Sequence, residues 1–244
     1  MVNVQPVALV TGGAHRIGRA IVEDLARHGW AVAIHARHSR ADAEALAASI
    51  RAGGGRAAAV DGDIADTTMH AATLAAAAEA LGPVTLLVNN ASMFEKDTFG
   101  ALDRALFDRQ LAVNLTGPVF LAQAFAQALP PDVEGNVVNL LDQRVYRPSP
   151  AYFSYQLAKS ALLTATEVMA QALAPRVRVN GIAPGPVLPS STQSAESFAR
   201  KVQTTLLKRA PELTEFGRTV RYFVDAKSVT GQVVALDSGE HLVP

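Results

Sequence analysis

The sequence predicts a single α/β domain in which a parallel sheet of about seven strands is flanked by helices on both faces. Two observations lead to this fold class. Short runs of valine, isoleucine and leucine alternate along the chain with longer alanine-rich segments, a pattern typical of right-handed β-α-β crossovers in a parallel sheet. No linker, repeat or low-complexity tract interrupts the 244 residues, which indicates one domain over residues 1–244.

The apolar runs place the predicted strands, and the segments between them carry the helical patterns. We expect strands near residues 7–10, 31–35, 56–60, 84–88, 135–140, 177–180 and 232–236. The helix predicted over residues 152–173 carries alanine, leucine, valine and methionine on most of its circumference. Because a helix that is apolar all round is buried, we expect another subunit to cover part of it.

Composition and charge exclude several classes of partner. Lys plus Arg and Asp plus Glu both total 22, and this zero formal net charge argues against electrostatic binding of nucleic acid or of an anionic membrane. The absence of cysteine excludes disulfides, thiolate nucleophiles and sulfur-ligated metals. The N-terminal sequence lacks the features of a secretory signal, and the best candidate for a membrane span, residues 70–88, is interrupted by Glu79, Gly82 and Pro83. We therefore expect a cytoplasmic, soluble protein that binds a small molecule and no metal.

The stretch "VALVTGGAHRIGRAIVEDLARHG" reads as a strand, a glycine turn and a helix. Gly12 and Gly13 permit a tight turn, and Gly18 allows close approach of the helix to the strand. The free N–H groups and the positive dipole at the start of such a helix suit a pyrophosphate. Although the spacing differs from the usual G-x-G-x-x-G, a glycine turn that opens the first strand-helix unit predicts a Rossmann-type, doubly wound sheet that binds a dinucleotide.

The end of the second predicted strand indicates which dinucleotide is bound. An acid about 20 residues beyond the glycine turn grips the adenosine ribose of NAD, and no acid is present there. Basic and polar side chains occupy this region and the turn instead: His15, Arg16, His35, Arg37, His38 and Ser39. They suit a 2′-phosphate and so predict NADPH, although solvated loop residues would look the same. Asp63, after the third strand, is either an adenine contact or an acid that stabilises a turn.

Tyr155 and Lys159 lie four residues apart on one face of a predicted helix. A cation this close favours the phenolate, so we expect the pKa of Tyr155 to lie below its reference value of ~10. That makes Tyr155 a candidate acid in proton transfer. A Tyr and a Lys at this spacing also occur by chance on helix surfaces, and the chemical interpretation depends on their place after a dinucleotide turn.

These motifs together resemble the short-chain dehydrogenase/reductase family, and the resemblance extends from end to end of the chain. Its elements are the turn Thr11 to Gly18, "NNAS" at Asn89 to Ser92, Asn114 in a helix, Tyr155 with Lys159, and the turn Pro184-Gly185. The resemblance implies that Lys159 also holds the nicotinamide ribose and that Asn114 and Lys159 support a water-linked proton path. It also implies a homotetramer built on helices near 105–129 and 152–173. The residues that it assigns to the cofactor are Gly12, His15, Arg16, Ile17, Gly18, Asn90, Ala91, Tyr155, Lys159, Pro184 and Gly185.

Two departures from the family pattern narrow the expected substrate. Asp142 stands 13 residues before Tyr155, where the family has a serine, and Arg16 and Ser92 replace glycines. This combination, with Phe94 two residues after Ser92, resembles the pteridine reductases and the dihydromonapterin or dihydrofolate reductases. The resemblance implies that Arg16, Ser92, Phe94, Asp142 and Tyr155 bind a pterin. An acid beside a tyrosine can accept a hydrogen bond from a ring N–H and relay a proton, and Phe94 can stack on a flat heterocycle.

Each departure also has a plainer explanation. Asp142 is then an acid that caps a helix or loop, with a ketone or 3-oxoacyl compound as the substrate of an NADPH-dependent carbonyl reductase. Phe94 is then a core residue, and Arg16 serves the cofactor alone. A non-catalytic dinucleotide-sensing protein on a reductase fold is the alternative outside the enzymes.

The segment "PGPVLPSSTQSAESFAR", residues 184–200, interrupts the alternation of strands and helices. Its length and its prolines and serines predict a loop that serves as a lid over the substrate, extending to near residue 210, with an ordinary surface loop as the alternative. The charged tail around Glu240 and His241 is expected to reach a neighbouring subunit's site.

Overall fold

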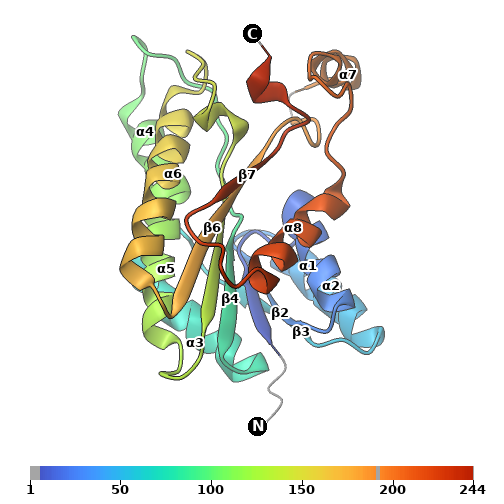
Figure 1. The fold of residues 1–244 in the computed structure, drawn as a ribbon, viewed down its shortest axis with the longest axis vertical. Helices are drawn as coiled ribbons and strands as arrows, with labels where there is room; N and C mark the ends of the chain where they lie inside the picture. Colours follow the sequence, from blue (N-terminus) through green and yellow to red (C-terminus); the bar gives the residue numbers. More distant parts are fainter. Residues whose placement is uncertain (1–5, 191–192, 244) are drawn as a thin grey trace.

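Seven parallel strands form one sheet in the computed structural model, which describes residues 6–190 and 193–243 (Figure 1). The order across the sheet is β3-β2-β1-β4-β5-β6-β7. The strands are β1 (Val7–Val10), β2 (Ala31–Ala36), β3 (Ala57–Asp61), β4 (Val84–Asn89), β5 (Gly135–Leu140), β6 (Val177–Pro184) and β7 (Val233–Leu236).

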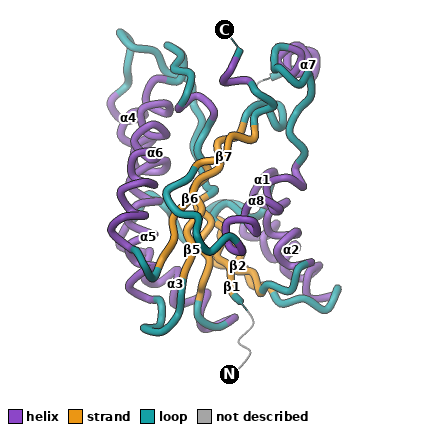
Figure 2. The backbone as a smooth tube through the Cα atoms, viewed as in Figure 1, coloured by secondary structure: helices purple, strands orange, loops and turns teal. Residues whose placement is uncertain are grey.

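Helices cover both faces of this sheet (Figures 1 and 2). On one face lie α1 (Arg16–Arg27), α2 (Arg40–Ala52) and α8 (Leu213–Asp225), which pack Ile21, Leu46 and Phe216 into one hydrophobic cluster. The other face carries α3 (His70–Leu81), α4 (Arg104–Leu111), α5 (Gly117–Ala128) and α6 (Phe153–Leu173). The shorter elements are η1 (Thr67–Met69), the π-helical turn η2 (Ala112–Thr116), η3 (Gln143–Val145), α7 (Ala195–Gln203) and η4 (Glu240–Leu242).

The predicted fold class, a doubly wound parallel sheet of seven strands, is confirmed, and most strands match the predicted ranges closely. The main difference is β6, which continues to Pro184 beyond the predicted end at residue 180. Residues 181–184 pair with β7, from Gly181 beside Val233 to Pro184 beside Leu236. Cross-strand pairing of the backbone therefore overrides the local tendency of Gly181 and Pro184 to end a strand.

The chain order reverses between β1 and β4, because β1, β2 and β3 run to one edge of the sheet and β4 to β7 run to the other. In open parallel sheets the carboxyl ends of the strands at such a switch point border the ligand crevice. Thr11 follows β1, Asn90 follows β4, Asp142 comes two residues after β5, and Gly185 follows β6. The fold thus brings four of the sequence motifs to one edge.

The segment predicted as a loop over residues 184–200 contains the start of a helix, so this prediction is wrong in part. α7 begins at Ala195, and the hydroxyl of Ser194 accepts a hydrogen bond from the backbone N–H of Ser197 at 3.2 Å. The serine-rich composition concealed a helix whose N-cap is itself a serine. Ser191 and Thr192 lie outside the described residues.

The long helix α6 is not buried all round within one chain. Leu157 and Val168 are 43% and 55% exposed, and Phe120 on the neighbouring α5 is 46% exposed. Among the described residues, no helix combines the length and the apolar character that crossing a bilayer requires.

Candidate active site

A cavity of about 880 Å³ opens at the carboxyl edge of the sheet. Its walls come from the turn after β1, the ends of β4, β5 and β6, the start of α6, the helix α7 and the C-terminal turn η4. The predicted site residues in this lining are Arg16, Ile17, Asn90, Ser92, Phe94, Asp142, Tyr155, Lys159, Pro184 and Gly185. Residues predicted from five separate motifs therefore share one cavity.

The glycine turn is held by side chains of two neighbouring strands. The hydroxyl oxygen of Thr11 accepts hydrogen bonds from the backbone N–H groups of Asn90 and Ala91, each at 2.9 Å. The side-chain amide of Asn90 donates in return to the carbonyls of Thr11 and Gly12. A Cβ atom added to Gly18 would lie 2.3 Å from the carbonyl oxygen of Gly12, so no larger residue fits there. The turn and the start of α1 form the close-packed cradle that a pyrophosphate requires.

His35 does not lie on the surface where the sequence places it. Its side chain is buried, with Nε2 3.0 Å from the carbonyl oxygen of Gly62 and Nδ1 accepting the N–H of Gly12. Burial lowers the pKa of His35, against the opposing effect of the Gly62 carbonyl. The imidazole therefore supports the turn as a neutral group, and the prediction that it binds a phosphate is wrong, because a neutral and buried ring offers no charge to an anion.

Other basic residues predicted for the 2′-phosphate lie at the surface, Arg37 and His38 after β2 and His15 in the glycine turn. Arg37 forms an ion pair with Asp63 at 3.1 Å, and His15 approaches Asp42 at 3.1 Å. Asp63 also accepts the backbone N–H of Ala65, which is the arrangement of an acid that stabilises a turn. His38 is exposed and Ser39 is half-buried. The carboxylates of Asp63 and Asp42 are thus the present partners of Arg37 and His15, and binding of a 2′-phosphate stays a prediction.

Asp142 faces the cavity and also holds the loop that follows it. Its Oδ1 accepts the backbone N–H of Arg144 at 2.9 Å and caps η3, while its Oδ2 accepts a hydrogen bond from the hydroxyl of Tyr155 at 3.0 Å. Burial raises the pKa of Asp142, against the hydrogen bond from Arg144 and the Arg144 charge. One oxygen of the carboxyl group therefore caps the loop, and the other contacts Tyr155.

Tyr155 is positioned by the start of α6. The carboxylate of Asp97 accepts hydrogen bonds from the backbone N–H and the hydroxyl of Ser154, which fixes the first turn of the helix. The pKa of Tyr155 is raised well above its ordinary value, first by burial and then by the negative charge of Asp142. The prediction that Lys159 lowers this pKa is wrong, because burial and the neighbouring carboxylate outweigh the cation.

Lys159 lies one turn further along α6 and is fully buried. Its ammonium donates a hydrogen bond of 2.6 Å to the carbonyl oxygen of Leu140 and lies 5.8 Å from the centre of the Tyr155 ring. Burial lowers the pKa of Lys159 to about 8, against the charge of Asp142. The lysine therefore lies beside the phenol at the strand end, as the spacing predicts, without a hydrogen bond to it.

Asn114 lies in the π-helical turn η2 between α4 and α5. Its Oδ1 accepts hydrogen bonds from the hydroxyl of Ser92 at 2.8 Å and from the N–H of Met93 at 3.1 Å, and its Nδ2 donates to the carbonyl of Met93 and to Gln110. Insertions of this kind often mark functional sites in helices. Asn114 thus links the helix to Ser92 and lies behind the cavity wall.

Phe94 is 42% exposed and stands in an aromatic group at the cavity wall. Its ring stacks on Tyr152 with centroids 4.1 Å apart and meets Tyr155 edge-on at 4.7 Å. The guanidinium of Arg144 lies 5.1 Å from the Tyr152 centroid and 5.9 Å from that of Phe94. Tyr152 itself has a left-handed backbone, with φ of 60°, at the residue before α6.

Arg16 connects the glycine turn to the lid segment. Its guanidinium donates hydrogen bonds to the carbonyls of Pro189 at 2.9 Å and Leu188 at 3.2 Å. The sequence predicts contacts of Arg16 with the cofactor phosphates or the substrate ring. In the structure its donors are directed to the backbone of the segment that follows β6.

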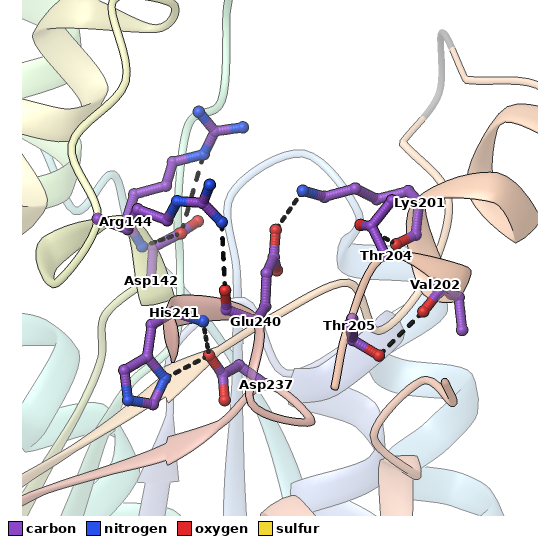
Figure 3. A network of polar contacts seen from close by, with 10 residues as sticks. Asp142, Arg144, Lys201, Val202, Thr204, Thr205, Asp237, Glu240 and His241 are labelled. Atoms are coloured by element: carbon purple, nitrogen blue, oxygen red, sulfur yellow. Dashed lines mark hydrogen bonds and ion pairs between the residues drawn. The ribbon is translucent and has the colours of Figure 1, made fainter. Parts of the chain in front are cut away.

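The C-terminal turn η4 contributes Glu240 to the lining of the cavity, and Figure 3 shows this turn near α7. The carboxylate of Glu240 is buried and pairs with the ammonium of Lys201 on α7. Asp237 holds this turn, because its carboxylate accepts hydrogen bonds from the N–H groups of Gly239 and His241. The tail that was expected to reach a neighbouring subunit's site is thus folded onto the cavity of its own chain.

The comparisons with known proteins agree with this geometry. The short chain dehydrogenase family profile matches residues 6–200, and the chain belongs to that family. Pteridine reductase 1 of Leishmania tarentolae is 32% identical over 282 residues, which cover 97% of this chain and 96% of that protein. The 3-oxoacyl-(acyl-carrier-protein) reductase of Staphylococcus epidermidis is 27% identical over 240 residues, with coverage of 96% and 98%.

Among solved structures, FolM alternative dihydrofolate reductase 1 from Brucella canis, complexed with NADP, is 54% identical and superposes with a TM-score of 0.95. The match covers 98% of this chain and 95% of that chain.

Several residues of the cavity were not predicted from the sequence, namely Arg144, Tyr152 and Lys201, and Glu240 was expected at a neighbouring subunit's site instead. Arg144 and Tyr152 lie between Asp142 and Tyr155 in the chain, so their position near the site was predictable from the sequence. Their orientation was not, because it depends on η3 and on the left-handed backbone at Tyr152. Lys201 and Glu240 come from segments that only the folded chain brings together.

Proposed function

We propose that the protein is an NADPH-dependent reductase that reduces a C=N bond of a dihydropterin or dihydrofolate. The observation that carries this proposal is the hydrogen bond from the Tyr155 hydroxyl to Asp142 at 3.0 Å, in a cavity that also contains the ring of Phe94. A relative named as an alternative dihydrofolate reductase and another named as a pteridine reductase support it.

The turn after β1 fits the pyrophosphate of the cofactor. Gly12 has φ of +61°, and Gly18 leaves no room for a side chain between α1 and the carbonyl of Gly12. Ile17, Asn90, Pro184 and Gly185 line the neighbouring wall. No acid directly follows β2. A 2′-phosphate would therefore be held there by Arg37, His38 and Ser39. When bound, the cofactor supplies a hydride.

The residues of the chain would supply the proton and orient the ring. Tyr155 keeps its proton at neutral pH because its pKa is raised, and Asp142 holds that hydroxyl in place. The pair can deliver a proton to the ring nitrogen next to the carbon that receives the hydride, which balances reduction of the C=N bond. Ser92 and Phe94 offer a hydroxyl and a stacking face to the heterocycle.

The direct test measures NADPH consumption with a panel of dihydropterins, dihydrofolate and simple ketones. We expect turnover with the dihydropteridines, and loss of turnover in Tyr155→Phe with NADPH binding nearly unchanged, because the phenol hydroxyl is the proton donor. Turnover of ketones alone, or undiminished turnover in Tyr155→Phe, would contradict the proposal.

The second candidate function is that of an NADPH-dependent carbonyl reductase, favoured by the similarity to a 3-oxoacyl reductase. Asp142→Ser separates the two, because serine is the neutral donor that a ketone oxygen requires. Under the pterin proposal this variant loses dihydropterin reduction. Under the alternative it keeps or gains ketone reduction.

Three further features of the protein belong to this proposal. The segment from Pro184 to near residue 210, with α7, would act as a lid over the substrate, supported by the bonds from Arg16 to its backbone. The exposed apolar side chains on α5 and α6 support a homotetramer in which a second copy covers them. A cytoplasmic location fits a cysteine-free chain that uses NADPH.

A further inference from the structure

Arg144 lines the cavity beside Asp142, and its guanidinium makes no hydrogen bond to any residue that the structure describes. Its Nε lies 3.9 Å from Oδ1 of Asp142, which is an ion pair beyond hydrogen-bond distance (Figure 3). The remaining contacts of the group are with the ring faces of Tyr152 and Phe94. Its side chain is 23% exposed, so the group is largely covered by the protein where it borders the cavity.

Other arginines of the chain use the same donors on the protein. Arg178 donates to four backbone carbonyls at and beyond the end of α8, and Arg16 donates to two in the lid segment. A guanidinium carries five N–H donors in a planar fork and cannot lose its charge. An arginine that is mostly removed from solvent with this fork unused is available to an acceptor on a ligand.

The position of Arg144 indicates which ligand supplies that acceptor. The residue belongs to the segment that carries Asp142 and stands over the aromatic group of Phe94 and Tyr152, whereas the glycine turn holds the place of the cofactor phosphates. The other cations of the lining are occupied, because Lys159 donates to the Leu140 carbonyl and Lys201 pairs with Glu240.

We propose that Arg144 binds a carboxylate of the substrate, so that the protein prefers pteridines that carry an acidic side chain, such as an aroyl-glutamate, over unconjugated pterins. Guanidinium and carboxylate match as a two-point hydrogen-bonded pair, and stacking on Tyr152 holds the fork in place. An unconjugated pterin offers no anion to this group. The inference rests on the proposed pteridine reduction and specifies its substrate class.

The test compares three substrates that differ in their carboxylates. Dihydrofolate carries the glutamate carboxylates, dihydropteroate carries one carboxylate on its benzoyl ring, and 6-hydroxymethyl-dihydropterin carries none. Arg144→Met keeps the length and the contact with the rings but removes the charge. We expect it to raise the KM for dihydrofolate about tenfold and to change the KM for 6-hydroxymethyl-dihydropterin by less than about twofold. Arg144→Lys should give an intermediate value. Dihydropteroate tests whether a carboxylate at the benzoyl position, which is an amide in dihydrofolate, also reaches the guanidinium.

Two results would overturn the inference. An equal loss on all three substrates would mean that Arg144 acts only as the counter-ion of Asp142, and this role would also shift the pH profile for every substrate alike. An unchanged KM for dihydrofolate would remove any role in recognition. Arg104→Met is the matched control, because Arg104 is 87% exposed and pairs with Asp108 on α4.

A measurement on the wild type keeps the inference testable if Arg144→Met does not fold. N-(4-aminobenzoyl)-glutamate should inhibit reduction of 6-hydroxymethyl-dihydropterin, and its uncharged diamide should not. Equal inhibition by both compounds, or by neither, would contradict the inference. If the wild type reduces none of the three pteridines, the proposed function itself fails, and the assignment of Arg144 fails with it.

Discussion

Tyr155 and Asp142 place two weak acids in hydrogen-bond contact within a mostly buried part of the cavity. The pKa of each is raised, for Asp142 by burial and for Tyr155 by burial together with the charge of Asp142. Each group therefore holds its proton to higher pH than it would in water. Two neighbouring groups with pKa values pushed upward suit a reaction that consumes a proton.

This pair predicts the pH dependence of the reaction. In the wild type, kcat/KM for a dihydropterin should fall as pH rises through the raised pKa of Asp142, because the pair then keeps only the phenolic proton. The Asp142→Asn variant should not show this fall of kcat/KM with rising pH, and its kcat/KM at low pH should be lower than that of the wild type. Its Tyr155 pKa should fall toward the ordinary value, because a negative neighbour is gone. Rates of NADPH oxidation from about pH 5 to about pH 9 would check this, and the same fall in the variant would refute it.

At the scale of residues, the sequence predicted which side chains share the cavity better than it predicted their burial and their pKa values. The positions of Asp142, Tyr155 and Lys159 follow from strand ends and helical spacing, which are local. The pKa of Tyr155 depends on how much solvent the fold removes, and so does the burial of His35. Neither is encoded in the spacing of a motif.

At the scale of elements, the ion pair between Lys201 and Glu240 joins α7 to η4 across the cavity (Figure 3). The two partners differ in burial, since the side chain of Glu240 is 5% exposed and that of Lys201 is 46% exposed. Removing the lysine leaves a buried carboxylate without its cation, whereas removing the charge of the glutamate leaves a lysine that water can solvate.

We therefore expect Lys201→Met to lower the free energy of unfolding by about 2 kcal/mol and Glu240→Gln to lower it by less than about 1 kcal/mol. Both variants should speed hydrogen exchange in α7, because each frees that helix from η4. Chemical denaturation and amide exchange would measure the two effects. Lys227→Met is the control, since Lys227 and Glu134 are about equally exposed at 70% and 69%. Equal losses in the two main variants would contradict this account.

The strands were predictable because a short run of apolar residues between turns rarely forms anything other than a buried strand. The glycine turn also predicted where α1 starts. The helix α7 was missed because its sequence, "AESFARKVQ", follows prolines and serines that are typical of loops. The placement of η4 against the cavity was also not predictable. Gly185 packs so closely on Asp237 that an added Cβ would lie 2.6 Å from its Cα, a contact between segments 52 residues apart (237 − 185).

At the scale of the whole molecule, one face of the helical layer lacks a partner within the chain. Leu157 and Val168 lie 11 residues apart on α6, which is close to three helical turns, so they share a face. Phe120 on α5 is also about half exposed. A second copy that covers this face would bury all three side chains, as the predicted homotetramer requires.

Val168→Glu should therefore yield a smaller species than the wild type, because a carboxylate would be buried without a partner at the interface. Sedimentation velocity would measure the state, and circular dichroism would confirm the fold. Ala48→Glu is the control, since Ala48 is exposed on α2, which covers the other face of the sheet. An unchanged assembly in Val168→Glu would place the interface elsewhere.

The shifted pKa values of Lys159 and Asp142 also affect the thermal stability of the protein. Because the pKa of Lys159 is lowered to about 8 from 10.5, the folded state binds that proton less tightly than the unfolded chain does, and folding gains stability as pH rises across this interval. The raised pKa of Asp142 likewise opposes its charged form. At neutral pH, variants with uncharged residues at both positions should therefore have a higher melting temperature than the wild type. Under the proposed mechanism, a screen that ranks variants by melting temperature alone would then enrich proteins that no longer turn over substrate.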